Sequence, residues 1–203
     1  MLVDRNKYID RIYTTNEGYN IKILQYLDKN NVLIQFIDFP EVQEWNTIQN
    51  IKNGQIKNPY HKDVYGIGYY GVGKYKSRIN NVKTEQYIKW FSMFTRCYNE
   101  DYQEKQPTYI GCTVDKTFHN FQNFAQWYDQ NKYESNYNLE LDKDFLFEGN
   151  KIYSPSTCCL LPKEINTLIN FKRHDKNMMK KLYDKYKDEL PYYLRMHLFE
   201  LTK

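Results

Sequence analysis

Aromatic side chains are the feature that most limits what this chain can fold into. The sequence of 203 residues contains 21 Tyr, 11 Phe and 3 Trp, so that 17% of its positions are aromatic. Disordered chains are poor in such residues, so the sequence predicts a folded protein over most of its length. The hydrophobic share of 41% and the charged share of 27% are typical of a soluble globular protein. The length predicts one or two domains.

The sequence contains no signal for a membrane or for secretion. No apolar run approaches the ~18 residues that cross a bilayer, and residues 1–10 lack the apolar core of a secretory signal. We therefore expect a reducing cytoplasm and no membrane partner. The four cysteines form no C-x-x-C pair, and two of them are adjacent, which disfavours a shared metal. We expect buried free thiols and no structural zinc at Cys97, Cys112, Cys158 and Cys159.

The charge balance is mildly basic, with 29 Lys and Arg against 25 Asp and Glu and a formal net charge of +4. This balance permits nucleic-acid binding without requiring it. Glycine and tyrosine dominate residues 54–76, where interspersed cations suit phosphate contact combined with base stacking. The alternative is a loop that packs its tyrosines against a small sheet. The cations expected to contact DNA are Lys57, Lys74, Lys76 and Arg78, then Lys172, Arg173 and Lys176 in a basic C-terminal helix.

The N-terminal residues have the pattern of a small β module, which we place at 1–60. Residues 19–26 alternate with period two, residues 28–31 form a turn cluster, and residues 32–37 are a β-branched and aromatic run. These features predict a hairpin. Residues 47–52 fit either a short helix or a strand.

Two amphipathic helices are predicted in the central segment, which we place at 61–138. Thr84 is a suitable N-cap for a helix over 85–98, because apolar residues then recur at three and four positions. Residues 118–128 carry an aromatic stripe at the same spacing, which core packing explains better than a cofactor does. A loop over 99–107 and a short strand over 109–114 separate the two helices.

The order of elements over 139–171 is strand, loop, strand, helix. Residues 139–146 read as the first strand and residues 158–161 as the second. Pro162 fits the first position of the helix that follows. We predict two antiparallel strands packed on one helix, and two further helices over 175–189 and 191–201 in a basic tail at 172–203. The whole is an α+β chain.

Several of these segments together resemble the phage HNH homing-type endonucleases. The residues that carry the resemblance are Y-I-K-W-F-S-M-F-T-R-C-Y at 87–98, Tyr109-x-x-Cys112-x-Val114, and the phenylalanines that precede Trp127. They continue with L-D-K-D at 141–144, G-N-K at 149–151, Y-S-P-S-T-C at 153–158 and E-I-N at 164–166. The last group resembles the ββα-metal core of that family. The N-terminal hairpin is similar to the small β DNA-binding modules that accompany such cores.

The resemblance implies a metal-dependent endonuclease that acts on double-stranded DNA inside a host bacterium. Asp142 matches the acidic metal ligand and Asn166 the helix ligand, while Asn150 matches the loop residue that orients the strand. Asp144 projects to the same side of a strand as Asp142, which makes it a second candidate ligand. Mg²⁺ or Mn²⁺ held by a carboxylate, an amide and waters would then assist phosphodiester hydrolysis.

Position 143 departs from the family, because Lys143 stands where the general-base His is expected. A lysine is ordinarily protonated at neutral pH and cannot take a proton from water, although it can bind phosphate or stabilise a transition state. A more distant base would have to be one of the four histidines: His61, His119, His174 or His197.

Three hypotheses follow. The first is an HNH-like nuclease that uses Asp142, Lys143 and Asn166. The second is a DNA-binding protein of the same fold that does not cleave. The third is a phage protein that binds and inhibits a host protein, for which a tyrosine-rich surface is equally suitable. The third predicts no salt-dependent affinity for DNA.

Overall fold

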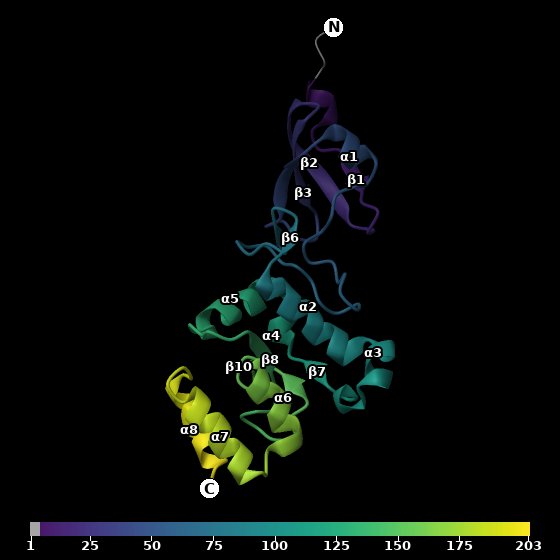
Figure 1. Ribbon diagram of the computed structural model, residues 1–203. Helices are drawn as coiled ribbons and strands as arrows, with labels where there is room; N and C mark the ends of the chain where they lie inside the picture. Colours follow the sequence, from purple (N-terminus) through teal and green to yellow (C-terminus); the bar gives the residue numbers. More distant parts are fainter. Residues whose placement is uncertain (1–4) are drawn as a thin grey trace. The chain divides into compact units, whose positions relative to one another are not determined.

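The protein has an α+β fold, and the computed structural model describes residues 5–203 except for the side chains of Arg5, Asn6 and Lys172. The described chain divides into two compact units (Figure 1). The first takes in the chain up to His61 together with Tyr70–Val72. The second takes in Lys62–Tyr69 and Gly73–Lys203.

A four-stranded antiparallel sheet in the order β1-β2-β3-β4 forms the first unit (Figure 1). The expected hairpin is confirmed as β2 and β3, and the sheet gains a strand on each side. Alternate residues of the hairpin are buried and pack with α1 into one hydrophobic core. The elements are the 3-10 turn Arg5–Tyr8, β1 (Ile12–Thr14), β2 (Asn20–Asp28), β3 (Asn31–Phe36), β4 (Gln43–Asn46) and α1 (Ile48–Lys52).

Aromatic packing joins the first helices of the second unit. Trp90 on α2 (Glu85–Tyr98) lies 5.0 Å from the Phe94 ring and 5.4 Å from the Phe121 ring on α5 (Phe121–Asn131). The predicted bounds and Thr84 cap of α2 are confirmed. The single helix expected over 118–128 is wrong. Asn120 is extended there and caps α5 with its side chain, so that α4 (Lys116–His119) is separate.

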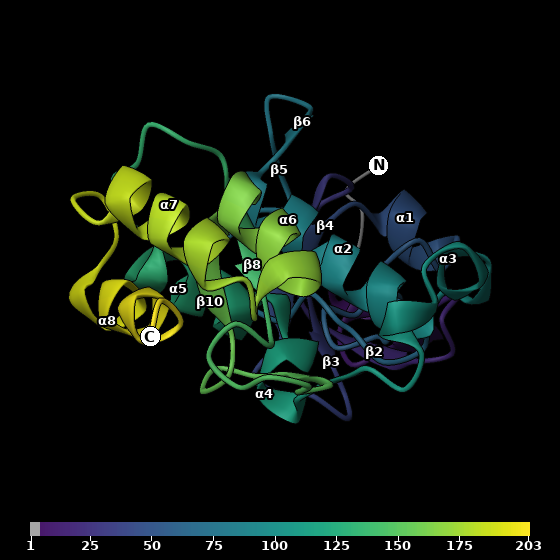
Figure 2. The ribbon, with the colours of Figure 1, turned by 60° about the horizontal axis from the view of Figure 1, so that its bottom comes forward.

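The segment before α2 and the segment after it contain elements that the sequence patterns did not predict. A hairpin of β5 (Arg78–Ile79) and β6 (Val82–Lys83) projects from the second unit (Figure 2). The loop expected over 99–107 contains α3 (Glu100–Lys105), and a 3-10 turn at Pro107–Tyr109 follows it. The strand predicted over 109–114 is confined to β7 (Thr113–Val114).

Two antiparallel strands and one helix form the unit predicted over 139–171, here called the ββα unit. β8 (Leu139–Asp142) pairs with β10 (Cys159–Pro162), with Asp142 opposite Cys159. α6 (Lys163–Lys172) packs on both strands and buries Ile165 and Ile169. The first strand is shorter than predicted, and β9 (Ile152–Tyr153) pairs in parallel with β7 instead.

The chain ends in two helices that pack against each other, α7 (Lys176–Tyr186) and α8 (Tyr192–Glu200) (Figure 2). Their buried residues join those of the ββα unit in one apolar core, which includes Phe145, Ile165, Met179, Leu182 and Leu198. Within the described part of the chain, every helix is too short or too polar to cross a bilayer. All four cysteines are buried free thiols, and burial raises the pKa of Cys97 to about 12.

Candidate functional site

Asp142 ends β8 and is only 5% exposed. Its Oδ1 accepts hydrogen bonds from the backbone N–H groups of Asp144, at 2.8 Å, and of Phe145, at 2.5 Å. These bonds turn the chain away from β10 and explain why the strand stops here. Burial and the neighbouring Asp144 carboxylate raise the pKa of Asp142 to about 6, although the backbone bonds and the Lys143 ammonium act in the opposite direction.

Lys143 is also buried, with 8% of its side chain exposed. Its ammonium lies 3.1 Å from Asp144 Oδ2. The same nitrogen lies 5.8 Å from the ring centroid of Tyr153 and 6.0 Å from that of Tyr109, within reach of cation–π attraction. The parallel pairing of β7 with β9 places Tyr153 beside the turn that carries Tyr109. A carboxylate and two aromatic rings therefore surround this cation.

A second cation, Arg96 from α2, lies near the same two tyrosine rings as Lys143. Its guanidinium donates to the carbonyl of Leu141 at 3.2 Å and to the Tyr153 hydroxyl at 3.4 Å. It also lies 5.6 Å from the centroid of Tyr109. The sequence interpretation assigned no role to Arg96, Tyr109 or Tyr153, although all three belong to segments that carry the family resemblance. These residues lie far from residue 143 in the sequence, so no local sequence pattern predicts that they cluster around it.

The two asparagines differ in their contacts. Asn150 donates from Nδ2 to the carbonyl of Lys143 at 2.6 Å and to that of Ile152 at 2.7 Å, so it holds the loop after β8 against β9. Asn166 is half-buried on α6. In the part of the chain that the structure describes, no hydrogen bond joins its side chain to another residue, Asp142 included.

These residues do not fit a divalent cation. One Asp142 oxygen already accepts two backbone bonds, and the raised pKa makes this carboxyl a poorer anion. A cation on Asp144 would lie against the Lys143 ammonium, which carries the same sign of charge. The ligands that Mg²⁺ and Mn²⁺ prefer are carboxylate oxygens free of such competition. The contacts of Asp142 and Asp144 are therefore with the turn and with Lys143, and Asn166 alone among the three candidate ligands has no such contact with a described residue.

The histidines lie elsewhere. His119 Nε2 contacts the Val114 carbonyl at 3.0 Å, and His174 Nε2 lies 3.1 Å from Glu148. The His197 ring packs on Phe145 at 4.8 Å, and His61 contacts the Tyr19 hydroxyl within the first unit. Among the described residues, no imidazole hydrogen-bonds or ion-pairs with Asp142, Lys143 or Asp144. The described residues of the site thus include no imidazole to act as the general base that the family resemblance implies.

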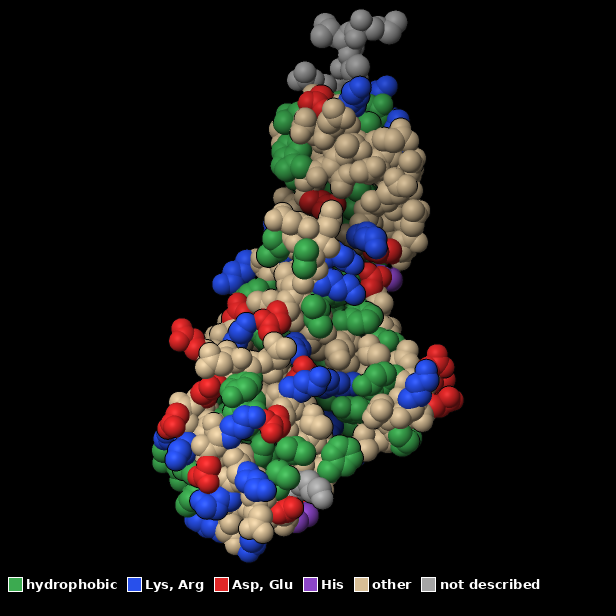
Figure 3. Space-filling view, viewed as in Figure 1, with side chains coloured by type: hydrophobic (Ala, Val, Ile, Leu, Met, Phe, Trp, Pro, Cys, Tyr) green, Lys and Arg blue, Asp and Glu red, His purple; other side chains and the backbone are tan. Residues whose placement is uncertain are grey.

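The cations expected to contact DNA fall into two classes. Lys74, Lys76 and Arg78 are exposed and line one pocket of about 420 Å³, in the region of β5 and β6 where Lys and Arg side chains gather (Figure 3). Arg173 instead points inward and donates to the carbonyls of Asp144, at 2.7 Å, and Phe145, at 3.0 Å.

The remaining predicted DNA contacts are distributed more widely. Lys57 is exposed in the first unit. Lys176 donates to the carbonyl of Lys203 at the C-terminus. The side chain of Lys172 lies outside the described part of the structure. Of the seven predicted cations, the structure thus brings three together.

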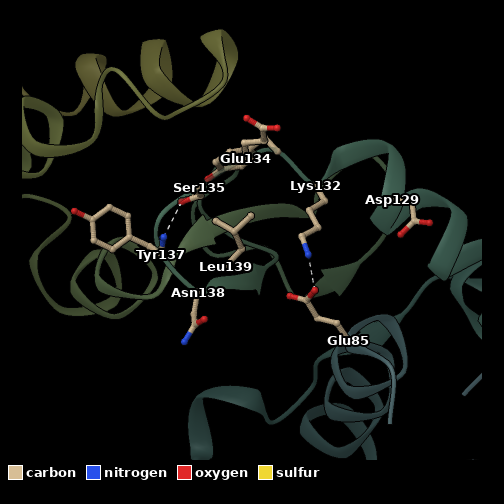
Figure 4. A pocket seen from close by; sticks show the side chains of 9 residues that line it. Glu85, Asp129, Lys132, Glu134, Ser135, Tyr137, Asn138 and Leu139 are labelled. Carbon is tan, nitrogen blue, oxygen red and sulfur yellow. Dashed lines mark hydrogen bonds and ion pairs between the residues drawn. The ribbon is translucent and has the colours of Figure 1, made fainter. Parts of the chain in front are cut away.

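Another pocket, of about 570 Å³, lies between the start of α2, the end of α5 and β8 (Figure 4). Its walls carry carboxylates as well as cations, and Lys132 forms an ion pair with Glu85 across it (Figure 4). Neither Asp142 nor Lys143 lines this pocket. Its mixed charge gives no preference for an anionic ligand.

Comparisons with known proteins do not identify a family or a function for this chain. No protein-family model, curated protein or solved structure matches the chain. The HNH resemblance accordingly remains an interpretation of the residues themselves. The geometry around Lys143 and the basic pocket at β5 and β6 are the two features on which a function can be argued.

Proposed function

We propose that this chain is a DNA-binding protein whose ββα unit, similar to that of HNH nucleases, does not cleave DNA. The observation that carries the proposal is the environment of Lys143. Its ammonium lies between Asp144 and two tyrosine rings, at the position where the family resemblance places the general base.

An ammonium in this position opposes two requirements of metal-assisted hydrolysis, the general base and the bound metal. It donates hydrogen bonds and cannot remove a proton from water. It also repels a divalent cation from the adjacent carboxylate. With the Asp142 carboxyl hydrogen-bonded to the turn, the acidic residues of the ββα unit serve to hold its loop.

The support for DNA as the partner is the pocket formed by Lys74, Lys76 and Arg78. These cations are exposed, and no carboxylate in the described part of the chain forms an ion pair with them. Such cations attract the phosphate backbone and release its counterions, which gives salt-dependent affinity. Lys57 in the first unit adds a further exposed cation. Double-stranded DNA is the partner that the family resemblance implies.

Metal-dependent cleavage is the second candidate, because the ββα unit has the strand order that the family resemblance predicts, with Asp142 at the end of the first strand. Binding to a host protein is the third, and it predicts no salt-dependent affinity for DNA.

A gel-shift assay and a plasmid-nicking assay, run together with Mg²⁺ or Mn²⁺, separate the three candidates. The wild type should shift duplex DNA at low salt and nick no more plasmid than a buffer control. Nicking that disappears in Asp142→Ala and persists in Lys116→Ala, an exposed control, would establish cleavage instead. Absence of any shift at low salt would overturn DNA binding and favour the protein partner.

Lys143→His tests the missing base directly. If the loss of cleavage rests on this residue alone, the variant should gain nicking activity that rises through the pKa of imidazole, near 6.5. We expect little gain, because the Asp142 carboxyl is committed to its backbone bonds. A strong gain would show that the donor set can rearrange around a metal.

A further inference from the structure

We infer that the pocket beside β5 and β6 is a binding site for one unpaired nucleotide, so that the protein prefers DNA with single-stranded character. This inference rests on the proposed function and adds a ligand to it. The pocket measures about 420 Å³, within the range of sites that hold small ligands. Its lining residues are Lys74, Tyr75, Lys76, Arg78, Ile79, Asn80, Thr84, Gln86 and Phe121.

The cations of the pocket are available to an anion. Lys74, Lys76 and Arg78 are exposed, and no carboxylate in the described part of the chain forms an ion pair with any of them. Lys89 and Lys132, by contrast, lie within 3 Å of a glutamate oxygen. Three uncompensated charges around one hollow favour a phosphate group.

The backbone that carries these cations is fixed. Gln122 on α5 accepts from the N–H of Tyr75 at 2.9 Å and donates to its carbonyl at 3.0 Å. The Thr84 hydroxyl donates to the carbonyl of Lys76 at 2.8 Å. Because these bonds use only backbone atoms of the loop, the side chains of Tyr75 and Lys76 remain free for a ligand.

The N-terminus of α2 adds to the positive potential. Thr84 and Gln86 from its first turn line the pocket, and the dipole of this 14-residue helix places partial positive charge there. Glu85 in the same turn is acidic, but Lys132 pairs with its carboxylate in the neighbouring pocket (Figure 4). The electrostatics of the basic pocket therefore remain favourable to phosphate.

An aromatic ring indicates that the ligand is more than a phosphate. Tyr75 lines the hollow, and the Lys74 ammonium lies 5.0 Å from its ring centroid. Phe121 also borders the hollow but is only 1% exposed and packs on Trp90, so Tyr75 is the ring that can stack. A ring inside a pocket can stack on a base only if that base has left the duplex stack. Single-stranded DNA meets this condition, because its bases stack on aromatic side chains while cations track its backbone.

Fluorescence anisotropy with oligothymidylate and with a blunt-ended two-strand duplex of equal length tests the inference. The wild type should bind the single strand more tightly than the duplex. Tyr75→Leu should weaken single-strand binding about tenfold and duplex binding less than twofold, because it removes stacking and leaves the cations. Tyr75→Phe should retain the wild-type preference, and Tyr192→Leu, at a tyrosine that is 69% exposed, should change neither affinity.

The charge variants separate phosphate contact from general attraction. Lys74→Ala/Lys76→Ala should lower the salt slope of single-strand binding by about 1.4, while the exposed control pair Lys105→Ala/Lys116→Ala should leave it unchanged.

The two proposals can fail separately. Equal affinity for single strand and duplex, with Tyr75→Leu neutral, would overturn the nucleotide site and leave DNA binding standing. An acidic peptide that competes for the pocket in place of oligothymidylate would also overturn it. Failure of the wild type to bind either DNA at low salt would overturn the proposed function as well.

Discussion

Two sets of cations in this protein have opposite environments. The Lys143 side chain is 8% exposed, and its ammonium is paired with Asp144 and enclosed by two tyrosine rings. Lys74 and Lys76 lie at the surface of an open pocket without an acidic partner in the described structure. The comparison shows that the neighbouring side chains, and not the residue type alone, decide whether a lysine stabilises the fold or is available to bind a ligand.

The largest expected effect is the loss of stability when the buried cation is removed. Lys143→Met keeps the length of the side chain but leaves Asp144 without its ion pair. We expect the free energy of unfolding to fall by about 3 kcal/mol, the low end for a broken buried pair, because Asp144 is 25% exposed. Urea denaturation followed by circular dichroism measures this change.

Lys76→Met is the matched control, since it removes an exposed cation that has no acidic partner among the described residues. It should change the free energy of unfolding by less than ~0.5 kcal/mol. The double variant Lys143→Met/Asp144→Asn should recover part of the lost stability, because no charge is then left unpaired. If Lys143→Met and Lys76→Met lowered the free energy of unfolding equally, the buried lysine would contribute no more to stability than the exposed one.

Substitution of the exposed lysines Lys74 and Lys76 should weaken DNA binding and leave the stability of the protein nearly unchanged. Lys74→Ala/Lys76→Ala should reduce the slope of log K against log salt for duplex DNA by about 2, because two phosphate contacts are lost. Titrations at several salt concentrations measure the slope. If Lys105→Ala/Lys116→Ala reduced it equally, attraction to DNA would be a property of net charge and not of this pocket.

Elements with local signals were predictable from the sequence. Thr84 and the apolar spacing define α2 because the cap and the periodicity lie within one segment. The strand, loop, strand and helix of the ββα unit have equally local signals, among them Pro162 before the helix. The interruption at Asn120 was missed, because the aromatic stripe continues through it with helical spacing.

The candidate site was less predictable, because long-range contacts create it. A lysine between two aspartates suggests a solvated strand, yet Lys143 is buried by Tyr109 and Tyr153. Tyr153 belongs to β9, whose parallel pairing with β7 joins two strands of only two residues each, for which the sequence has no periodic signal. The sequence likewise suggests that Arg173 is a surface cation, but in the structure it donates hydrogen bonds to the carbonyls of Asp144 and Phe145 in the turn after β8.

The buried carboxyl of Asp142, next to Lys143, predicts a pH dependence of the stability of the protein. Its folded-state pKa, raised to about 6, exceeds the ~3.9 of an unfolded aspartate, so the folded state binds the proton more tightly. Its contribution to stability is therefore full below about pH 4 and is lost as the pH rises through about 6. The stability of the wild type relative to Asp142→Asn should fall over this interval, as measured by urea denaturation at each pH.

Asp142→Asn is informative because the amide oxygen can still accept the two backbone bonds. Asp142→Ala cannot, and should be less stable than Asp142→Asn by about 1–3 kcal/mol at every pH. A flat difference between wild type and Asp142→Asn would mean that the carboxylate is ionised without penalty, and therefore more open to a cation than its burial indicates.

The smallest expected effect concerns the turn that holds Arg78 at the pocket. Asn80 and Asn81 join β5 to β6 with φ of 49° and 64°, and Arg78 donates to the Asn81 carbonyl at 3.0 Å. Two left-handed residues match a type I′ turn, in which Asn-Gly is favoured, so Asn81→Gly should leave the hairpin intact. Asn81→Val forces a β-branched residue into this region, at a local cost of about 1–2 kcal/mol.

Because β5 and β6 contain two residues each, this strain should open the hairpin and spare the rest of the unit. We expect Asn81→Val to weaken DNA binding about twofold, through loss of a fixed position for Arg78, while global stability changes by less than ~0.5 kcal/mol. Amide exchange at residues 78–83 and anisotropy with oligothymidylate measure the two effects. A loss of affinity as large as that of Lys74→Ala/Lys76→Ala would mean that the exposed cations, like the buried one, depend on the structure around them.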